Sequence, residues 1–382
     1  MKIKSVEAYP VSFPLEVPSQ DATGVWHDWS TVLVKITAED GSFGWGEIGP
    51  LHGGGIAVFV AIVEHKLKDI LIGEDCFDRE RLYQKMLGRG TSSYAFGQKG
   101  AIVTAIAGID IALWDLAGKL LDTPVYKMLG GATHAKIPAY ASGFFGKEGR
   151  PLTPAECADE AKSYADQGFK GVKMKVGYGS ESDLENLAAV RKALGPDLGI
   201  MVDANQGFSY HSVMKIAGRM AEFDLTFFEE PLPINDLDGM AELVKAVDFP
   251  IAAGENYYTR YEFREVISKR AVNIVQPDII HAGGITETRK IADMASAWNI
   301  PLAPHIHATV GTAASIHLLT STPNTLAAEY ITSGGSFRLR RELFGDEYIA
   351  EDGWVSASDK PGLGIEIRPE ALEKYYPKIL KK

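Results

Sequence analysis

The sequence is poor in cysteine, and its basic residues are outnumbered by acidic ones. Only Cys76 and Cys157 occur among 382 residues, far apart and without metal-ligand spacing. We therefore expect two buried free thiols in a reducing compartment, with no disulfide framework. The formal net charge of −11 argues against binding to nucleic acids or anionic membranes. No signal peptide and no apolar run of membrane-spanning length is apparent, so we expect a cytoplasmic protein.

Three apolar segments each end in a carboxylate. Asp203, Glu229 and Glu255 follow such segments and are 26 residues apart in both steps, about one strand, one helix and two loops. Polar residues at the carboxyl ends of buried parallel strands project from the rim of the sheet. Three carboxylates at neighbouring strand ends repel one another unless a cation neutralises them, and oxygen ligands favour a hard divalent ion. The pattern therefore predicts a site for Mg²⁺.

The spacing of strands and helices predicts the fold. Strand patterns alternate with amphipathic helical patterns from about residue 137, over 137–141, 171–176, 199–203, 226–229, 250–254, 272–276, 301–304 and 325–329. Eight strands with helical crossovers favour a (β/α)₈ barrel, with a doubly wound open sheet as the alternative. The last strand–helix pair is irregular.

The residues before the barrel predict a separate α+β unit. Strand patterns cover 2–13, 31–38 and 43–47, flexible loops are expected at about 15–30 and 49–55, and helical periodicity dominates 57–129. We place the domain boundaries at 1–130, 131–350 and 351–382. The last segment, with strand and turn patterns, is expected to rejoin the first unit.

Two lysines and a histidine are the candidate bases. Lys173 and Lys175 are two residues apart on one strand, so both side chains lie on the same face and point toward the barrel mouth. There a second cation and a metal would lower the pKa of Lys175. His305 follows the seventh strand and Asp278 the sixth, an arrangement that fixes an imidazole tautomer and raises its basicity. A substrate at the centre would have one base on each side.

This arrangement suits removal of a proton from the carbon next to a carboxylate. The resulting enediolate needs a divalent cation at the carboxylate oxygens and a further donor on the opposite side. Glu329, at the end of the eighth strand, could be that donor if its surroundings protonate it. Asn205 shares a face with Asp203, whereas Glu230 should point away from Glu229 toward a structural partner. His281 and His307 could contact the substrate.

Taken together, these motifs resemble the enolase superfamily, and more narrowly its mandelate racemase subgroup. The resemblance rests on Lys-x-Lys, Asp-x-Asn, Glu-Glu-Pro, Gly-Glu-Asn, Pro-Asp, the later His and the final Glu, together with Trp45-Gly46-Glu47, Gly108–Asp115 and Leu129-Gly130-Gly131. It implies an α+β capping domain over a modified (β/α)₇β barrel, which would explain the irregular final pair. A homo-oligomer, from dimer to octamer, is also expected.

The resemblance assigns roles to the site residues. It implies Mg²⁺ on Asp203, Glu229 and Glu255. Lys175 would be one base and His305, paired with Asp278, the other. Lys173 would contact the substrate carboxylate, and Glu329 would lie opposite the metal.

The capping loops would then hold the far end of the substrate. Asp21, His27 and His52 suit hydroxyl groups, whereas Val25, Trp26 and Trp29 suit an apolar group. We favour a polar substrate, an acid sugar.

The resemblance leaves the reaction open between related enzymes. Residues 175–179 and 202–208 are similar to an aldaric lactone cycloisomerase, and 276–287 to galactonate dehydratases, which carry a histidine where this chain has Asn205. That difference argues against galactonate itself. We expect dehydration of an acid sugar to a 2-keto-3-deoxy acid. The alternatives are a racemase, epimerase or cycloisomerase using the same bases, and a non-catalytic binding protein built on the barrel.

Overall fold

The first part of the chain forms an antiparallel sheet covered by helices. The computed structural model describes residues 1–51, 55–91, 95, 97–147, 149–332 and 334–377. The first elements are β1 (Ile3–Asp21), β2 (Gly24–Ala38), β3 (Phe43–Leu51), α1 (Ile56–Ile62), the π-helical turn η1 (Val63–Leu67), α2 (Lys68–Leu71), α3 (Arg79–Met86), α4 (Ala101–Leu120) and α5 (Val125–Met128). The strand order is β3-β2-β1-β5, with β5 (Gly146–Lys147) supplied by a later loop.

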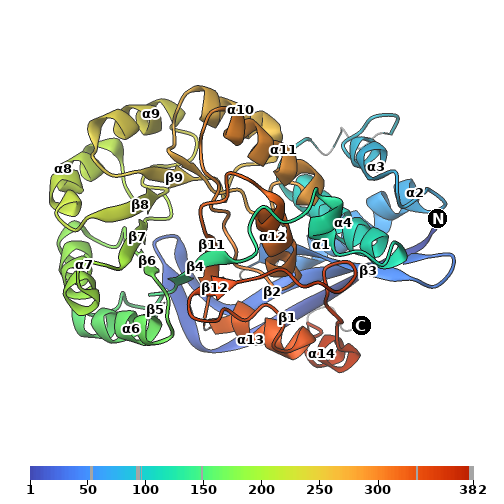
Figure 1. Ribbon diagram of the computed structural model, residues 1–382, viewed down its shortest axis with the longest axis horizontal. Coiled ribbons are helices and arrows are strands. Elements are labelled where there is room, and N and C mark those ends of the chain that lie inside the picture. Colours follow the sequence, from blue (N-terminus) through green and yellow to red (C-terminus); the bar gives the residue numbers. More distant parts are fainter. Residues whose placement is uncertain (52–54, 92–94, 96, 148, 333, 378–382) are drawn as a thin grey trace.

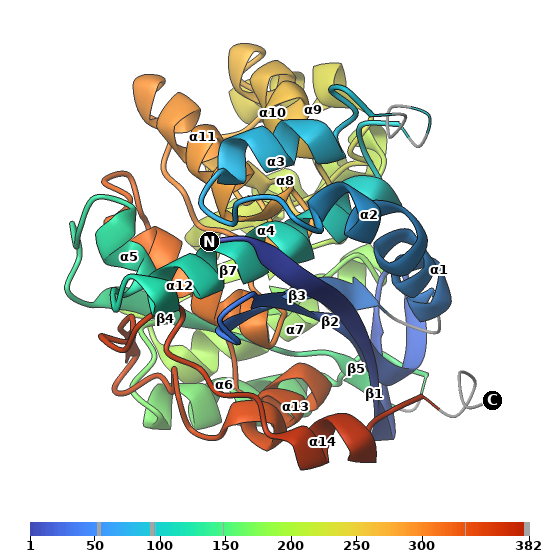
Figure 2. The same ribbon diagram turned by 90° about the vertical axis from the view of Figure 1, so that its right-hand side faces the viewer.

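The loop expected at about 15–30 is instead a long β-hairpin. β1 and β2 pair as far as Asp21 and Gly24, and their register shifts between Pro14 and Ser19. Two prolines in this stretch weaken its strand pattern, but pairing with β2 keeps it extended. Figure 2 shows how far β1 runs across the molecule. The hairpin extends to β5, through the pairs of Ser19 with Lys147 and of Gln20 with Gly146. The other expected loop, 49–55, is partly strand β3, and 52–54 lie outside the described residues.

Helix α4 packs closely on the sheet. A Cβ atom on Gly46 would lie 1.9 Å from the carbonyl oxygen of Gly108, so only glycine allows β3 to approach the helix this closely. By length and composition α4 could cross a membrane, contrary to our expectation that no such run exists, but 89% of its most apolar window is buried inside the protein. This burial identifies α4 as a core helix.

The second part of the chain alternates strand and helix. Its elements are β4 (Ile137–Ser142), α6 (Pro154–Asp166), β6 (Gly171–Lys175), α7 (Ser180–Leu194), β7 (Gly199–Asp203), α8 (Tyr210–Ala221), β8 (Leu225–Glu229), α9 (Leu237–Ala246), β9 (Ile251–Ala253), α10 (Thr259–Ser268), β10 (Ile274–Val275), α11 (Gly284–Ala297), α12 (Val310–Ser321), β11 (Ala328–Ile331) and α13 (Gly334–Phe344). In Figure 1 helices α6 to α10 form an arc outside strands β6 to β9.

The second sheet is a barrel rather than a doubly wound sheet. Its strands pair in the order β11-β4-β6-β7-β8-β9-β10, parallel throughout, and a doubly wound sheet would reverse this order at a switch point. Leu302 forms parallel bridges to Val275 and Thr325, so it takes the place of a seventh strand and closes the sheet toward β11. The irregularity of the barrel thus lies at its seventh strand, whereas the eighth, β11, is followed by helix α13.

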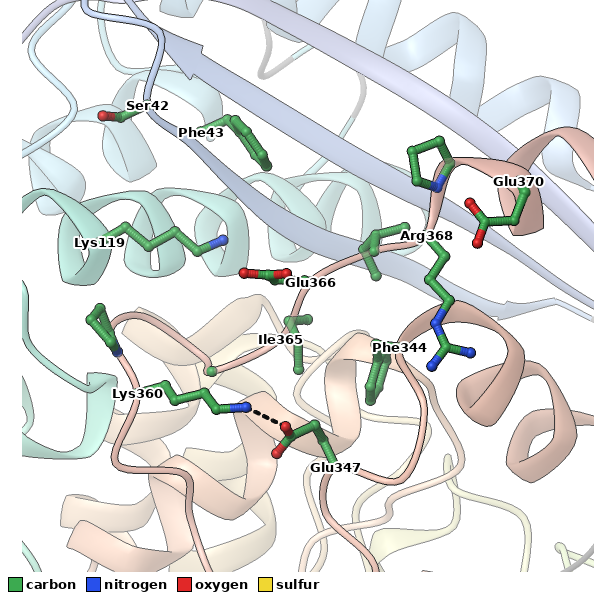
Figure 3. A pocket seen from close by; sticks show the side chains of 14 residues that line it. Ser42, Phe43, Lys119, Phe344, Glu347, Lys360, Ile365, Glu366, Arg368 and Glu370 are labelled. Carbon is green, nitrogen blue, oxygen red and sulfur yellow. Dashed lines mark hydrogen bonds and ion pairs between the residues drawn. The ribbon is translucent and has the colours of Figure 1, made fainter.

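The tail of the chain returns to both units. β12 (Trp354–Val355) pairs with β4, and α14 (Pro369–Lys374) follows. The amide of Leu363 donates to Asp115 of α4 at 2.8 Å, and Ser12 of β1 donates to the carbonyl of Tyr375 at 2.8 Å. A groove of about 950 Å³ lies where the tail passes Phe43 and Lys119 (Figure 3). Its lining residues include none of the three predicted metal ligands.

Candidate active site

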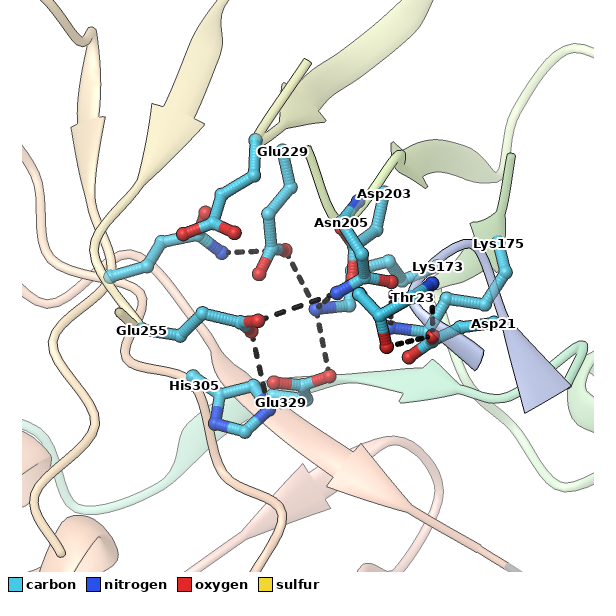
Figure 4. Close-up of polar contacts among 12 residues, drawn as sticks. Asp21, Thr23, Lys173, Lys175, Asp203, Asn205, Glu229, Glu255, His305 and Glu329 are labelled. Carbon is cyan, nitrogen blue, oxygen red and sulfur yellow. Dashed lines mark hydrogen bonds and ion pairs between the residues drawn. The ribbon is translucent and has the colours of Figure 1, made fainter. Parts of the chain in front are cut away.

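The three acids meet at the carboxyl ends of neighbouring strands. Asp203 is the last residue of β7 and is paired in register with Glu229, the last residue of β8. Glu255 follows β9 after Gly254, where a Cβ atom would lie 2.5 Å from the backbone of Gln276. One carboxylate oxygen from each acid lies within 4.8 Å of the others. Figure 4 shows the three side chains converging.

The acids fit a divalent cation. Asp203 and Glu229 are fully buried, and the Oε1 atom of Glu229 and the Oε2 atom of Glu255 have no hydrogen-bond partner among the described residues. Burial raises the pKa of Glu229 to about 8, with Asp203 and Glu255 adding to the effect and Lys173 opposing it. Buried oxygens without donors are costly unless a cation occupies the space between them. Asp203, Glu229 and Glu255 would hold Mg²⁺.

Lys173 lies beneath this cluster. Its Nζ atom is 2.6 Å from Oε2 of Glu229, 2.9 Å from Oε1 of Glu329 and 3.8 Å from Oδ2 of Asp203. Burial disfavours the ammonium, but the surrounding carboxylates outweigh burial and raise the pKa of Lys173. The side chain is therefore a fixed positive charge at the floor of the site.

Lys175 occupies one side of the cluster. Its Nζ atom donates to Oδ2 of Asp203 at 2.6 Å and to Oδ1 of Asn205 at 3.0 Å. We expected its pKa to be lowered, and for the protein's own charges this was wrong. Burial and Lys173 lower the pKa of Lys175, but the carboxylates of Asp203, Glu255 and Asp21 raise it by more, so the net effect is an increase. Any lowering would have to come from bound Mg²⁺, whose charge offsets that of the acids.

His305 lies on the opposite side of the cluster from Lys175 in Figure 4. Its Nδ1 atom is 2.7 Å from Oδ2 of Asp278, and its Nε2 atom is 3.4 Å from Oε2 of Glu255. Burial lowers the pKa of His305, but Glu255, Glu329 and the hydrogen bond with Asp278 raise it to about 10. The predicted pairing of His305 with Asp278, and the raised basicity, agree with this geometry.

Glu329 accepts hydrogen bonds rather than donating one. Its Oε2 atom accepts from the amide of Ile306 at 3.0 Å, and its Oε1 atom faces Lys173. Burial favours the neutral acid, but the charges of Lys173 and His305 lower the pKa of Glu329. The suggestion that its surroundings keep Glu329 protonated is therefore wrong for the protein's own charges.

Two further predictions concern the amide and acid next to the cluster. Asn205 lies on the same face as Asp203, as expected, and links Lys175 to Glu255, to which its Nδ2 atom donates at 3.3 Å. Glu230 accepts two hydrogen bonds, of 3.1 and 2.9 Å, from Nδ2 of Asn256, which also donates to Oε1 of Glu255 at 3.3 Å. Asn256 is the structural partner that we expected for Glu230.

The predicted substrate-binding residues have mixed outcomes. The Trp26 ring is 5.9 Å from that of Phe145, and the His307 ring lies between Phe145 at 5.7 Å and Trp29 at 4.0 Å. Because Nζ of Lys175 lies 5.3 Å from the Phe145 ring, Trp26 and His307 form an aromatic wall beside that base. The side chain of His27 is exposed. His52 lies outside the described residues.

His281 is not at the centre of the site. Its ring packs 4.3 Å from the ring of Tyr258, and its Nδ1 atom is 3.4 Å from Oγ1 of Thr104 in α4. Burial lowers its pKa, which favours the neutral ring. His281 therefore joins the barrel to the first unit, a contact that sequence spacing cannot reveal.

Sequence reasoning missed Gln276 and Phe145. Gln276 is fully buried and donates from Nε2 to Oε2 of Glu229 at 2.9 Å, so it fixes that carboxylate. Its position, two residues before Asp278 on the same face of the strand end, could have indicated that it belongs to the site. Phe145 follows β4 in a loop with no distinctive pattern.

Comparison with protein-family models finds two matches that together cover most of the chain. The N-terminal domain of mandelate racemase and muconate lactonizing enzyme matches residues 3–130. The enolase C-terminal domain-like model matches residues 156–371. The second match contains every predicted metal ligand and base.

Curated relatives and solved structures cover nearly the whole chain. The arabinonate dehydratase of Saccharolobus solfataricus is 35% identical over 379 residues, 98% of this chain and 99% of that protein. The D-galactarolactone cycloisomerase of Agrobacterium fabrum is 33% identical over 383 residues, 98% and 99% of the two chains. A racemase from Streptomyces coelicolor A3(2), crystallised with bound magnesium, has a TM-score of 0.89 and 31% identity, and covers 98% of this chain and 100% of its own.

Proposed function

Because the chain belongs to the mandelate racemase and muconate lactonizing enzyme family of the enolase superfamily, we propose that it dehydrates an acid sugar to a 2-keto-3-deoxy acid. It is a Mg²⁺-dependent enzyme of the lyase or isomerase type, as its relatives' names indicate. The observation that supports the proposal most strongly is a lysine and a histidine on opposite sides of three converging carboxylates.

The proposed chemistry follows from the bases. Bound Mg²⁺ would supply positive charge to the substrate carboxylate as the α-proton leaves. Lys173 adds a second positive charge, because its ammonium lies against Glu229 and Glu329. Lys175 or His305 removes the α-proton, and the conjugate acid of one of them protonates the departing β-hydroxyl.

The geometry around each base supports its part in this scheme. Asp278 holds the Nδ1 side of His305, which leaves Nε2 directed at the cluster. Asn205 and Asp203 hold the ammonium of Lys175. Lys175 is thus oriented by a carboxylate and an amide and His305 by a carboxylate, and the enediolate would form between the two bases.

An acid sugar is the substrate class that fits both the polar and the apolar side chains beside Lys175. Asp21, at the tip of the β1–β2 hairpin, lies near Lys175 in Figure 4, and its carboxylate accepts hydrogen bonds from Thr23. Carboxylates bind hydroxyl groups well, and the ring of Phe145 suits the C–H face of a sugar. A cycloisomerase acting on a sugar lactone is the second candidate, favoured by the D-galactarolactone relative.

Proton exchange in D₂O tests the proposal. The probes are arabinonate with its C2 epimer ribonate, galactarate with its C2 epimer talarate, and galactarolactone, with a keto-acid assay alongside. Exchange with keto-acid release is the expected result. Exchange without keto acid would favour the isomerase, and no exchange with any probe would favour a binding protein.

A variant pair assigns the bases. Lys175→Ala is expected to fold and bind Mg²⁺ but to lose exchange with the epimer whose α-proton faces Lys175. His305→Asn should lose exchange with the other epimer. If Lys175→Ala exchanged both epimers at the normal rate, Lys175 would not be a base.

We also propose a cytoplasmic homo-oligomer organised as a capping domain (1–130), a barrel (131–350) and a returning tail (351–382). Both cysteines are buried free thiols, which suits a reducing compartment. Light scattering after size exclusion would measure the oligomeric state.

A further inference from the structure

A buried carboxylate of the first unit binds the start of a barrel helix. Glu47, in β3, is 1% exposed. Its Oε2 atom accepts hydrogen bonds from the amides of Thr309 at 2.9 Å and Gly311 at 2.8 Å, and its Oε1 atom accepts one from Oγ1 of Thr31 at 2.9 Å. The two amides open α12, so Glu47 connects the N-terminal sheet to the barrel.

Glu47 takes the place of a local cap for this helix. Thr309 is at the N-cap position of α12, but its side chain makes no capping hydrogen bond, and its Oγ1 atom has no partner among the described residues. The first amides of a helix need acceptors, and a negative charge at this end is favourable. The acceptor comes from a residue more than 250 positions earlier in the chain.

The segment just before α12 carries His305. Its beginning is held by the barrel, because His305 binds Asp278 and the amide of Ile306 donates to Glu329. Its end is held by Glu47 through Thr309, four residues after His305. The catalytic segment is therefore fixed at both ends, and one of the anchors belongs to the other unit.

Loss of the carboxylate would leave two buried amides without acceptors. Such amides cost free energy unless the backbone moves to find water or another acceptor. The available movement is that of residues 305–309, since α12 itself is buried along its length. A shift there would change the position of the imidazole and leave Lys175, on β6, in place.

We propose that Glu47 is a positioning residue for His305, holding the imidazole at its working distance from the substrate by capping α12 from the first unit. The inference rests on the proposed function, since it takes His305 to be one of two bases. Glu47 itself does not touch the metal ligands or the bases in the hydrogen bonds of the described residues.

The test compares Glu47→Ala and Glu47→Gln with the wild type on the epimer pairs named above. His305→Asn identifies the epimer that depends on His305. Glu47→Ala should slow exchange with that epimer by about 10²-fold, as expected for a small misplacement of a reacting group, and leave the other epimer nearly unchanged. Glu47→Gln should recover much of the rate, because its amide oxygen can still accept from Thr309 or Gly311.

Asp115→Ala is the matched control. Asp115 is equally buried and also accepts two backbone amides, from Trp45 at 2.8 Å and from Leu363 at 2.8 Å. Its loss should lower stability and affect both epimers alike. Equal slowing of both epimers by Glu47→Ala, or normal exchange with the His305-dependent one, would overturn the inference.

Amide hydrogen exchange provides a readout that needs no turnover. In Glu47→Ala the amides of Thr309 and Gly311 should lose protection, and in Asp115→Ala they should keep it. If the wild type catalysed α-proton exchange with none of the acid-sugar probes, the proposed function would fail. Unchanged protection in Glu47→Ala would separately show that Glu47 does not hold this segment.

Discussion

Asp110 should make the protein less stable as the pH rises from acid to neutral. It lies in α4, fully buried, and its Oδ2 atom accepts from the amide of Thr286 at 2.8 Å, while its Oδ1 atom has no partner among the described residues. Burial raises the pKa of Asp110 to about 7, although Thr286, Arg79 and Lys290 oppose the increase. The usual pKa of an aspartate is about 3.9.

The sign and size follow from linkage. Between these two pKa values the folded protein holds a proton that the unfolded chain has released, so stability is greatest below the unfolded pKa and is lost as the pH rises through about 7. The whole difference of about 3 pKa units corresponds to about 4 kcal/mol. About 2–3 kcal/mol of this falls between pH 5 and pH 8.

Asp110→Asn should remove this part of the pH dependence. Asparagine has the same shape, is always neutral and can still accept from the amide of Thr286. Urea unfolding at pH 5 and pH 8, with metal chelated, gives the change in the free energy of unfolding for each protein. The wild type should lose about 2–3 kcal/mol more than the variant. Asp293→Asn, an exposed carboxylate on α11, serves as control, and parallel curves for wild type and Asp110→Asn would refute the reasoning.

Three further results are expected. Mg²⁺ at about 100 times its dissociation constant should raise the free energy of unfolding by about 2.7 kcal/mol, and Asp203→Asn should abolish the increase in a metal titration followed by thermal melting. Burial lowers the pKa of His317 to about 4, so stability should fall by about 3 kcal/mol as the pH drops from about 6.5 to 4; a wild-type curve matching that of His317→Gln would contradict this. Gly46→Ala should destabilise by about 3 kcal/mol, measured by chemical denaturation, because its Cβ would overlap the carbonyl of Gly108 in α4. Gly218→Ala, with open space at the Cβ position, is the control and should not destabilise.

The acids and bases of the candidate site could be predicted because strand ends have a simple geometry. Side chains alternate along a strand and parallel strand ends align, so regular spacing was enough to bring Asp203 and Glu229 together. The same reasoning located Lys175, but not the sign of its pKa shift. That sign depends on the balance of several buried charges, which only distances can give.

Contacts between the two units could not be predicted. The sequence pattern places His281 in a loop, yet its ring packs against Tyr258 and contacts Thr104. The acceptor for the start of α12 is Glu47, in β3. Neither pairing leaves a local pattern, because the partners are far apart in the chain. The β1–β2 hairpin was missed for a related reason, since its extension past Pro14 depends on its partner strand.

The return of the tail has a consequence for how this chain is made on the ribosome. The Leu363 amide that binds Asp115 and the Tyr375 carbonyl that receives the amide of Ser12 are translated after the barrel. Until they emerge, Ser12 and Asp115 lack these partners, and the apolar cluster that includes Ile111 of α4 lacks Leu363. Chains of this kind are prone to aggregate during synthesis. Nascent chains stalled before residue 360 should therefore bind a chaperone more strongly than chains that extend through residue 377 do.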